Sequence, residues 1–359
     1  TLKKGDAVKI RYALVGGTGP CYAVTTEVDG KRVQGYLPGS ALAGLEDFDA
    51  ARKRASATTL PIVTRSQVEE VRQTAGRSDY ALAAEIFRAA DALEAGRPAD
   101  VETILARSGA PPGHRDAAII RAAALLELNQ PDRALGILEP ALRQSRKDAQ
   151  LLSLAGWASY RLDDARGALA YWKDALELRP DPGVEKMVRQ LEREMGADRS
   201  TQKSYGSRFL LRYDGAVAEP DTARSLVGVL EEEFTRISSQ LGCRAEERLV
   251  VIVQSKEAYQ GATGAPEWNG GQFDGRIRVP VARLLRIDSD TRQALAHELV
   301  HACLASLGRW PTWVHEGLAQ KLSGESLAPA AQDKLREMAR AGRLPKLESL
   351  GDGWWRLSG

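Results

Sequence analysis

The sequence predicts a multidomain protein made of a small β module, an all-α region and an α+β domain. The chain has 359 residues, and a typical domain has roughly 150, so two or three domains are expected. Hydrophobic residues account for 43% and charged residues for 27%, which is typical of globular proteins and excludes a long disordered or collagen-like chain. The residue types also change along the chain, from β-prone runs with turns, through an Ala- and Leu-rich region, to mixed strands and helices.

Residues 1–50 predict the small β module. Val8–Ile10 and Tyr22–Val24 are β-prone runs, and Asp29–Gly30 is a dipeptide that favours a tight hairpin turn. The stretch Gly35–Leu42 resembles the end of a bacterial SH3-like barrel. This resemblance implies either a module that binds a ligand or the cell wall, or a structural cap, and both interpretations stay open.

An all-α region is predicted over 68–198, after a linker over 51–67, because Ala, Leu, Glu and Arg dominate its composition. The dipeptides Ala134–Leu135 and Ala141–Leu142 recur as Ala168–Leu169 and Ala175–Leu176, an offset of 34 residues in both cases. That offset is the period of the tetratricopeptide repeats. The region resembles this family at Gly156, Ala168, Trp172, Ala175 and Pro180 in its second copy and at Ala122, Ala134, Leu138 and Ala141 in its first.

The resemblance to tetratricopeptide repeats implies pairs of helices, in which small residues permit close approach and large residues fill the groove. Residues 79–110 are interpreted as a further, degenerate copy. A stack of such repeats usually needs at least about three copies to be stable by itself, and only two good copies are present. We therefore expect the array to pack on a neighbouring domain. The resemblance also implies a groove for a protein partner, with a plain spacer as the alternative.

The remaining segment, 205–359, predicts an α+β domain. Strands are expected at Arg208–Tyr213 and Leu249–Val253, because both runs are β-prone and apolar. Between them, apolar residues spaced by three and four indicate an amphipathic helix that runs to Leu241 and ends at Gly242.

A third strand of this domain is expected over 272–281. Pro280 has no N–H group to donate, so this strand should lie at a sheet edge or end there. The next helix is expected from about 290 to Leu307, with Asp290 and Gln293 as its capping box.

That helix contains the motif His297-Glu298-Leu299-Val300-His301. Positions i and i+4 share one helix face, so both imidazoles can reach one metal ion, and imidazole suits zinc. Glu298 lies about 100° further round the helix, where it can contact a water beside the metal. Zinc lowers the pKa of such a water to about 7, and Glu298 would accept its proton as the general base. The motif therefore predicts Zn2+ as a cofactor.

A catalytic zinc site needs a third protein ligand, and both His315 and Glu316 have suitable side chains. They lie in a second short helix, for which Thr312 is the expected N-cap. The motif HExxH followed by Trp313-Val-His-Glu-Gly-Leu-Ala319 resembles the gluzincin zinc metallopeptidases, and 205–325 looks most similar to the bacterial peptidase MA-like families. The resemblance implies His297, His301 and Glu316 as zinc ligands. His315 stays open as the alternative ligand or as a donor to the transition state.

In gluzincins an extended substrate pairs with an antiparallel edge strand beside the metal. The resemblance therefore implies that Gly271, Gln272, Phe273 and Asp274 bind the substrate, although Asp274 beside Gly275 is more typical of a turn.

Two departures from the gluzincin pattern refine the predicted activity. Aminopeptidase relatives hold the substrate amino terminus with a glutamate that this chain lacks between Glu267 and Glu298, so we expect an endopeptidase. No Tyr or His follows Glu316, so the oxyanion donor would be His315 or would lie beyond Gly359, in a part that we expect to be missing.

Two functions compete on this evidence. The first is a zinc-dependent peptidase, a hydrolase acting on a peptide or protein substrate. The second is a catalytically weak or inactive metallopeptidase-fold scaffold that binds a protein partner through its repeats. The intact ligand set and Glu298 favour the enzyme, because an inactive module has no need of the base.

Charge and cysteine content bear on partners and compartment. Fifty basic and 48 acidic residues leave a net charge of +2, which argues against a nucleic-acid partner, and no apolar run reaches the 18 or so residues of a membrane-spanning helix. Cys21, Cys243 and Cys303 are interpreted as small packed residues, so they do not predict the compartment. Thr1 as first residue suggests that an upstream segment was removed or left out. The SH3-like and metallopeptidase resemblances favour an exported bacterial protein, such as a periplasmic one.

Overall fold

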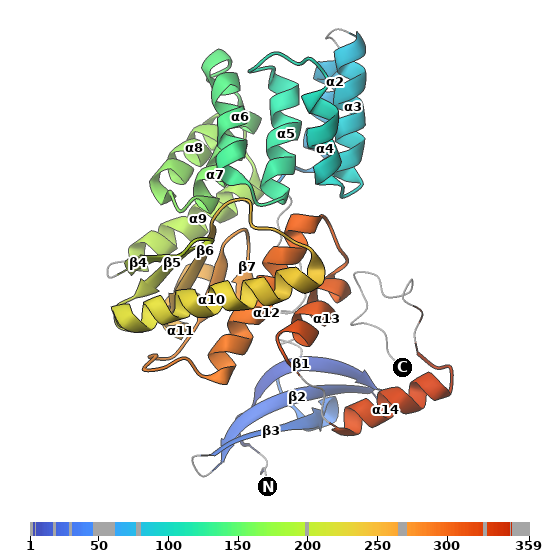
Figure 1. The fold of residues 1–359 in the computed structure, drawn as a ribbon, viewed down its shortest axis with the longest axis vertical. Coiled ribbons are helices and arrows are strands. Elements are labelled where there is room, and N and C mark those ends of the chain that lie inside the picture. The colour runs from blue at the N-terminus through green and yellow to red at the C-terminus, as the bar shows by residue number, and fades with distance from the viewer. Residues whose placement is uncertain are drawn as a thin grey trace. The chain divides into compact units, whose positions relative to one another are not determined.

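The computed structural model of the chain describes residues 3, 5–16, 19–28, 31–45, 62–76, 80–197, 201–264, 271–325, 329–344 and 346. Its internal contacts form two compact units. One unit contains a three-stranded sheet, and the other contains a stack of helices and a five-stranded sheet (Figure 1). The expected turn at Asp29–Gly30, most of the expected linker and the last residues of the chain lie outside the described residues.

The sheet near the N-terminus is antiparallel, and its described strands follow the order β1 (Lys9–Gly16), β2 (Gly19–Val28) and β3 (Lys31–Pro38). The two predicted β-prone runs lie in or next to β1 and β2. Tyr22 and Val24 are buried, with Leu37 and Leu42 packed against them. A short 3-10 helix, η1 (Gly39–Ala41), follows β3. The closed SH3-like barrel stays a prediction.

The region from 65 to 197 is helical in its described residues, and each helix contacts the next one along the chain (Figure 1). The helices are α2 (Arg65–Ala75), α3 (Tyr80–Glu94), α4 (Pro98–Ala106), α5 (Arg115–Glu127), α6 (Pro131–Gln144), α7 (Ala149–Arg161), α8 (Ala165–Leu178) and α9 (Pro182–Ala197). Helix α2 begins inside the stretch expected to be a linker. The reason is a capping box, in which the Thr64 hydroxyl accepts from Gln67 N and the Gln67 side chain accepts from Thr64 N.

The sequence period of 34 residues recurs in the helices. Helix α5 begins at 115 and α7 at 149, while α6 begins at 131 and α8 at 165. The helices α7 and α8 meet where Gly156 faces Trp172, since a Cβ on Gly156 would lie 2.8 Å from Trp172 Cγ. The fully buried Trp172 fills this contact and donates a hydrogen bond of 3.1 Å to Ser153 O. Gly156 and Trp172 therefore meet in the contact between α7 and α8, while membership of the tetratricopeptide family stays a prediction.

The larger sheet is mixed, and in the described part of the chain its strands follow the order β4-β5-β6-β8-β7. The central strands are parallel to one another, and the two outer strands are antiparallel to their neighbours. The strands are β4 (Thr201–Tyr205), β5 (Phe209–Asp214), β6 (Leu249–Gln254), β7 (Gln272–Phe273) and β8 (Ile277–Pro280). The predicted strands at 208–213 and 249–253 are confirmed as β5 and β6.

The single strand expected over 272–281 is wrong, because this segment forms a hairpin. Gly275 has a φ of +98°, which favours glycine, and the Asp274 side chain accepts a hydrogen bond of 3.2 Å from Arg276 N. Together they reverse the chain between β7 and β8. Only β7 lies at the sheet edge, while β8 pairs with β6 and ends at Pro280, as the missing N–H group predicts.

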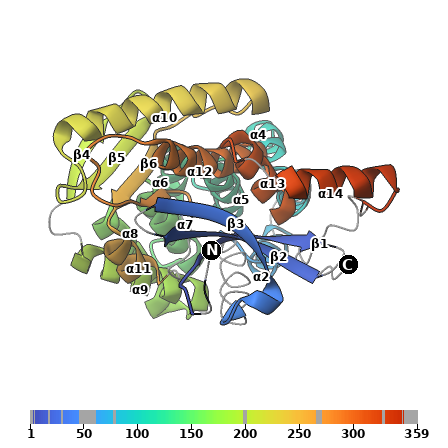
Figure 2. The ribbon, with the colours of Figure 1, turned by 90° about the horizontal axis from the view of Figure 1, so that it is seen from below.

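Helices cover both faces of the larger sheet (Figure 2). Helix α10 (Pro220–Leu241) and helix α12 (Ser289–Leu307) pack together on one face, where Phe209 of β5 contacts Phe234 of α10 with ring centroids 5.9 Å apart. Helix α11 (Lys256–Thr263) contacts α9 on the other face. The even-numbered side chains of β5 and β8 point to this second face, where Arg212 and Arg278 meet Glu194 of α9.

The N-cap residues of α12 and of the next helix differ from the expected ones. Asp288, not Asp290, caps α12, because its side chain accepts a hydrogen bond from Thr291 N. Helix α13 (Thr312–Leu322) begins at Thr312, and Pro311 occupies the N-cap position instead. Helix α14 (Pro329–Arg340), like β4 and α11, has no counterpart among the sequence predictions.

Candidate metal centre

Helix α12 carries the first two predicted metal ligands. The helix starts at the Asp288 cap and ends at Gly308, whose φ is +126°. His297 and His301 are one helical turn apart, and their ring centroids lie 4.9 Å from each other. The apolar face of the same helix is buried through Leu295 and Leu299. Packing of that face therefore fixes the direction in which the two imidazoles project.

The third predicted ligand lies within reach of these imidazoles. Ligand atoms of His297, His301 and Glu316 all lie within 4.8 Å of one another, and all three side chains are half-buried. Two imidazole nitrogens and one carboxylate oxygen form the donor set of a catalytic zinc site, which leaves a position open for water or substrate. The residues present therefore fit the predicted ion.

His315 is not part of this group of ligand atoms, so the arrangement favours Glu316 among the two candidates. Burial lowers the pKa of His315, and the neighbouring charge of Glu316 partly offsets this effect. A neutral imidazole at this position keeps one N–H donor. The role of His315 as donor to an oxyanion stays a prediction.

Glu298, the predicted general base, is 6% exposed on α12. It lies directly against the start of the edge strand, because a Cβ built on Gly271 would come within 2.7 Å of Glu298 Cδ and 2.8 Å of Glu298 Cγ. Only a residue without a side chain permits this approach. The predicted base and the predicted substrate strand are thus neighbours.

Gly271, Gln272 and Phe273, three of the predicted substrate-binding residues, lie at or next to β7, the outermost strand of the described sheet. Asp274 is placed differently. Its carboxylate accepts a hydrogen bond of 2.7 Å from the Tyr160 hydroxyl and lies 3.7 Å from Arg278 Nε. This engagement favours the turn interpretation of Asp274, which tethers the hairpin to α7.

Tyr259 of α11 is a residue near the site that sequence reasoning missed. The residue is 1% exposed, and its hydroxyl makes no hydrogen bond to any described residue. Burial raises the pKa of Tyr259, and the charge of Glu298 raises it further, so the phenol lies within the electrostatic reach of the base. No local motif marks Tyr259, because its proximity to Glu298 comes from the packing of α11 on the sheet.

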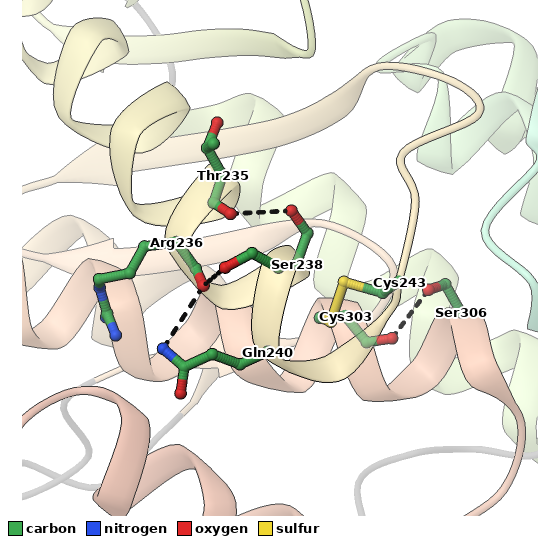
Figure 3. The surroundings of a disulfide bond; sticks show 8 residues. Thr235, Arg236, Ser238, Gln240, Cys243, Cys303 and Ser306 are labelled. Atoms are coloured by element: carbon green, nitrogen blue, oxygen red, sulfur yellow. Dashed lines mark hydrogen bonds between the residues drawn. A yellow bond between two sulfur atoms is a disulfide. The ribbon is translucent and has the colours of Figure 1, made fainter.

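A disulfide joins Cys243, which follows α10, to Cys303 on α12 (Figure 3). Because α12 carries the predicted ligands His297 and His301, it is called the metal helix below. Both residues are buried, and Cys303 lies two positions after His301. The interpretation of these cysteines as separately packed small residues is therefore wrong. The physical reason is that α10 and α12 pack side by side, which brings two positions 60 residues apart to a Cα–Cα distance of 5.5 Å.

A comparison with models of known protein families finds no match for this chain, and a comparison with curated proteins finds none either. Among the described residues, no helix combines the length and the apolar character that a membrane crossing requires.

Proposed function

We propose that this protein is a zinc-dependent peptidase, with His297, His301 and Glu316 as zinc ligands and Glu298 as general base. The observation that carries the proposal is the convergence of the three ligand atoms beside a buried carboxylate at the edge of a sheet. The resemblance to the gluzincin metallopeptidases, which covers the same residues, supports it.

Each group of residues at the site has a separate role in the hydrolysis of a peptide bond. A zinc ion held by the three ligands would supply Lewis acidity and lower the pKa of water to about 7. Glu298 accepts the proton of the attacking water and delivers it to the leaving amine. The backbone of β7 pairs with an extended substrate, because β7 is the outer strand and its far side has no described strand beside it. This mode of binding suits an endopeptidase.

The disulfide supports a proposal about compartment. Structural disulfides persist in oxidising compartments and are rare in the cytosol. A buried disulfide that reaches the metal helix therefore favours a protein that works after export, such as in a bacterial periplasm.

Cleavage of labelled casein by wild type and by Glu298→Gln tests the proposed function. We expect the wild type to cleave casein, a chelator to abolish cleavage, and Glu298→Gln to retain zinc while losing most of its activity, because the amide cannot accept the proton. Equal cleavage by both proteins would contradict the role of Glu298. Zinc binding without any cleavage of casein or a peptide library would favour the inactive scaffold instead.

A further inference from the structure

Buried and half-buried residues form a charge network between the larger sheet and the helical region of 65–197. Its members come from α7 and the residues that follow it, from α9, from β5 and from the β7–β8 hairpin, and they include Tyr160, Asp163, Glu194, Arg212, Asp274, Arg276 and Arg278. Arg276, directly before β8, and Arg278, on β8, are completely buried, although they alternate with apolar residues. Arginines are almost never so buried unless they are paired, and both of these arginines pair with Glu194.

Glu194 is the partner that the arginines share. One of its carboxylate oxygens lies 2.9 Å from Arg276 and 2.7 Å from Arg278, and the other lies 3.1 Å from Arg212. Burial alone would raise the pKa of Glu194, but the three arginines outweigh it and hold the pKa well below its usual range. The carboxylate therefore stays charged, and it ties α9 to two strands of the sheet.

Tyr160 and Asp274 tie α7 to the turn of the hairpin. The Tyr160 hydroxyl donates to Asp274 Oδ2 at 2.7 Å and accepts from Arg278 Nη2 at 3.1 Å, while its ring stacks on the Arg276 guanidinium at 3.6 Å. Gly275, the next residue of the turn, also lies against α7, because a Cβ on Gly275 would lie 2.8 Å from Arg161 Cδ.

The hairpin depends on these contacts because its own pairing is short. Strand β7 has two residues, which pair with β8 as Gln272 with Arg278 and Phe273 with Ile277. Removing one partner from a buried charged network leaves the others uncompensated, which is strongly unfavourable. The network therefore holds the hairpin in one position relative to the helices.

The repeats also hold the C-terminal end of the metal helix. Arg309, which follows Gly308, donates its backbone N–H to Gly96 O at 3.3 Å, and its guanidinium pairs with Glu127 at the end of α5. The metal helix and the substrate strand thus both have attachments on the same stack of helices.

We propose that Tyr160, Glu194 and Asp274 are positioning residues, through which the helical repeats set β7 against Glu298 in the geometry that a peptide substrate needs. The substrate part of this inference rests on the proposed function. The repeats are then a structural part of the catalytic unit, whatever partner their outer surface binds.

Two variants test the positioning role. Tyr160→Phe removes one hydroxyl and leaves the ring on Arg276, whereas Asp274→Asn removes the charge and keeps an acceptor oxygen for Tyr160. Tyr205→Phe is the matched control, because Tyr205 is 63% exposed and lies on β4, at the opposite edge of the sheet. For each protein we would measure zinc content, amide hydrogen exchange, and KM and kcat for labelled casein.

We expect full zinc content in all variants and several-fold faster exchange at 272–277 in Tyr160→Phe and Asp274→Asn, with a raised KM and a nearly unchanged kcat. Tyr205→Phe should match the wild type. Unchanged exchange at 272–277 in both network variants would overturn the positioning role, and so would an equal change across the whole chain.

Absence of cleavage by the wild type would overturn the proposed function and the substrate role together, while the exchange measurement still decides whether the repeats hold the hairpin. Should Tyr160→Phe fail to fold, Asp274→Asn decides.

Discussion

The contact between Gly271 and Glu298 makes a specific prediction for the variant Gly271→Ala. The new methyl group would lie 2.7 Å from Glu298 Cδ and 2.8 Å from Glu298 Cγ, whereas carbon atoms in optimal contact are about 3.5–4.0 Å apart. Either the strand or the carboxylate must therefore move by roughly 1 Å. Because consecutive atoms of a buried side chain are involved, rotation of its far end alone does not relieve the clash.

A misplacement of about 1 Å at a reacting group can cost around 100-fold in rate, so we expect Gly271→Ala to lower kcat/KM for casein by about two orders of magnitude. The zinc ligands lie outside the clash, so zinc content should stay at the wild-type level. Overpacking typically costs about 1–3 kcal/mol in stability, which urea unfolding would measure. Gly228→Ala is the control, because its Cβ meets no atom within 4 Å. Wild-type kcat/KM in Gly271→Ala would refute the proposed closeness of strand and base.

Three further predictions concern stability. Reduction of the Cys243–Cys303 disulfide, which spans 60 residues, should lower the free energy of unfolding by about 4 kcal/mol, and equal urea midpoints with and without reductant would contradict this. The folded-state pKa of Glu194 is depressed, so the unfolded chain binds the proton more readily. The free energy of unfolding should therefore fall as the pH drops below about 4.5. In Glu194→Gln this free energy should depend less on pH. Gly156→Ala should cost about 1–3 kcal/mol by overpacking Trp172, whereas Gly136→Ala, which meets no atom within 4 Å, should cost little in a thermal melt.

The cluster of His297, His301 and Glu316 could be predicted from the sequence because its geometry is local. His297 and His301 share a helix face through their spacing alone, and Glu316 follows after one tight turn. The repeat period was visible for a similar reason, since Gly156 and Trp172 belong to a pattern of fixed spacing within one helix pair.

The features that the sequence did not predict depend on contacts between distant segments. The alternation of Arg276 and Arg278 with apolar residues suggests a strand with one solvent-exposed face, yet Glu194 lies more than eighty positions away and makes that face buried. The disulfide could not be predicted from the sequence either, because the pairing of Cys243 with Cys303 follows from the packing of α10 on α12 rather than from their spacing. The sequence indicated a turn at Asp274–Gly275, but the hairpin that this turn forms was missed, because β-prone residues flank it on both sides and were assigned to one strand.

Zinc content per chain in the wild type, Glu316→Ala and His315→Ala tests the central claim most directly. The account predicts one tightly bound zinc in the wild type, retention of that zinc in His315→Ala, and loss of most of it in Glu316→Ala. The two variants change adjacent positions on α13, so they are matched in their effect on the helix. A wild type without stoichiometric zinc, or loss of zinc from His315→Ala with retention in Glu316→Ala, would contradict the account.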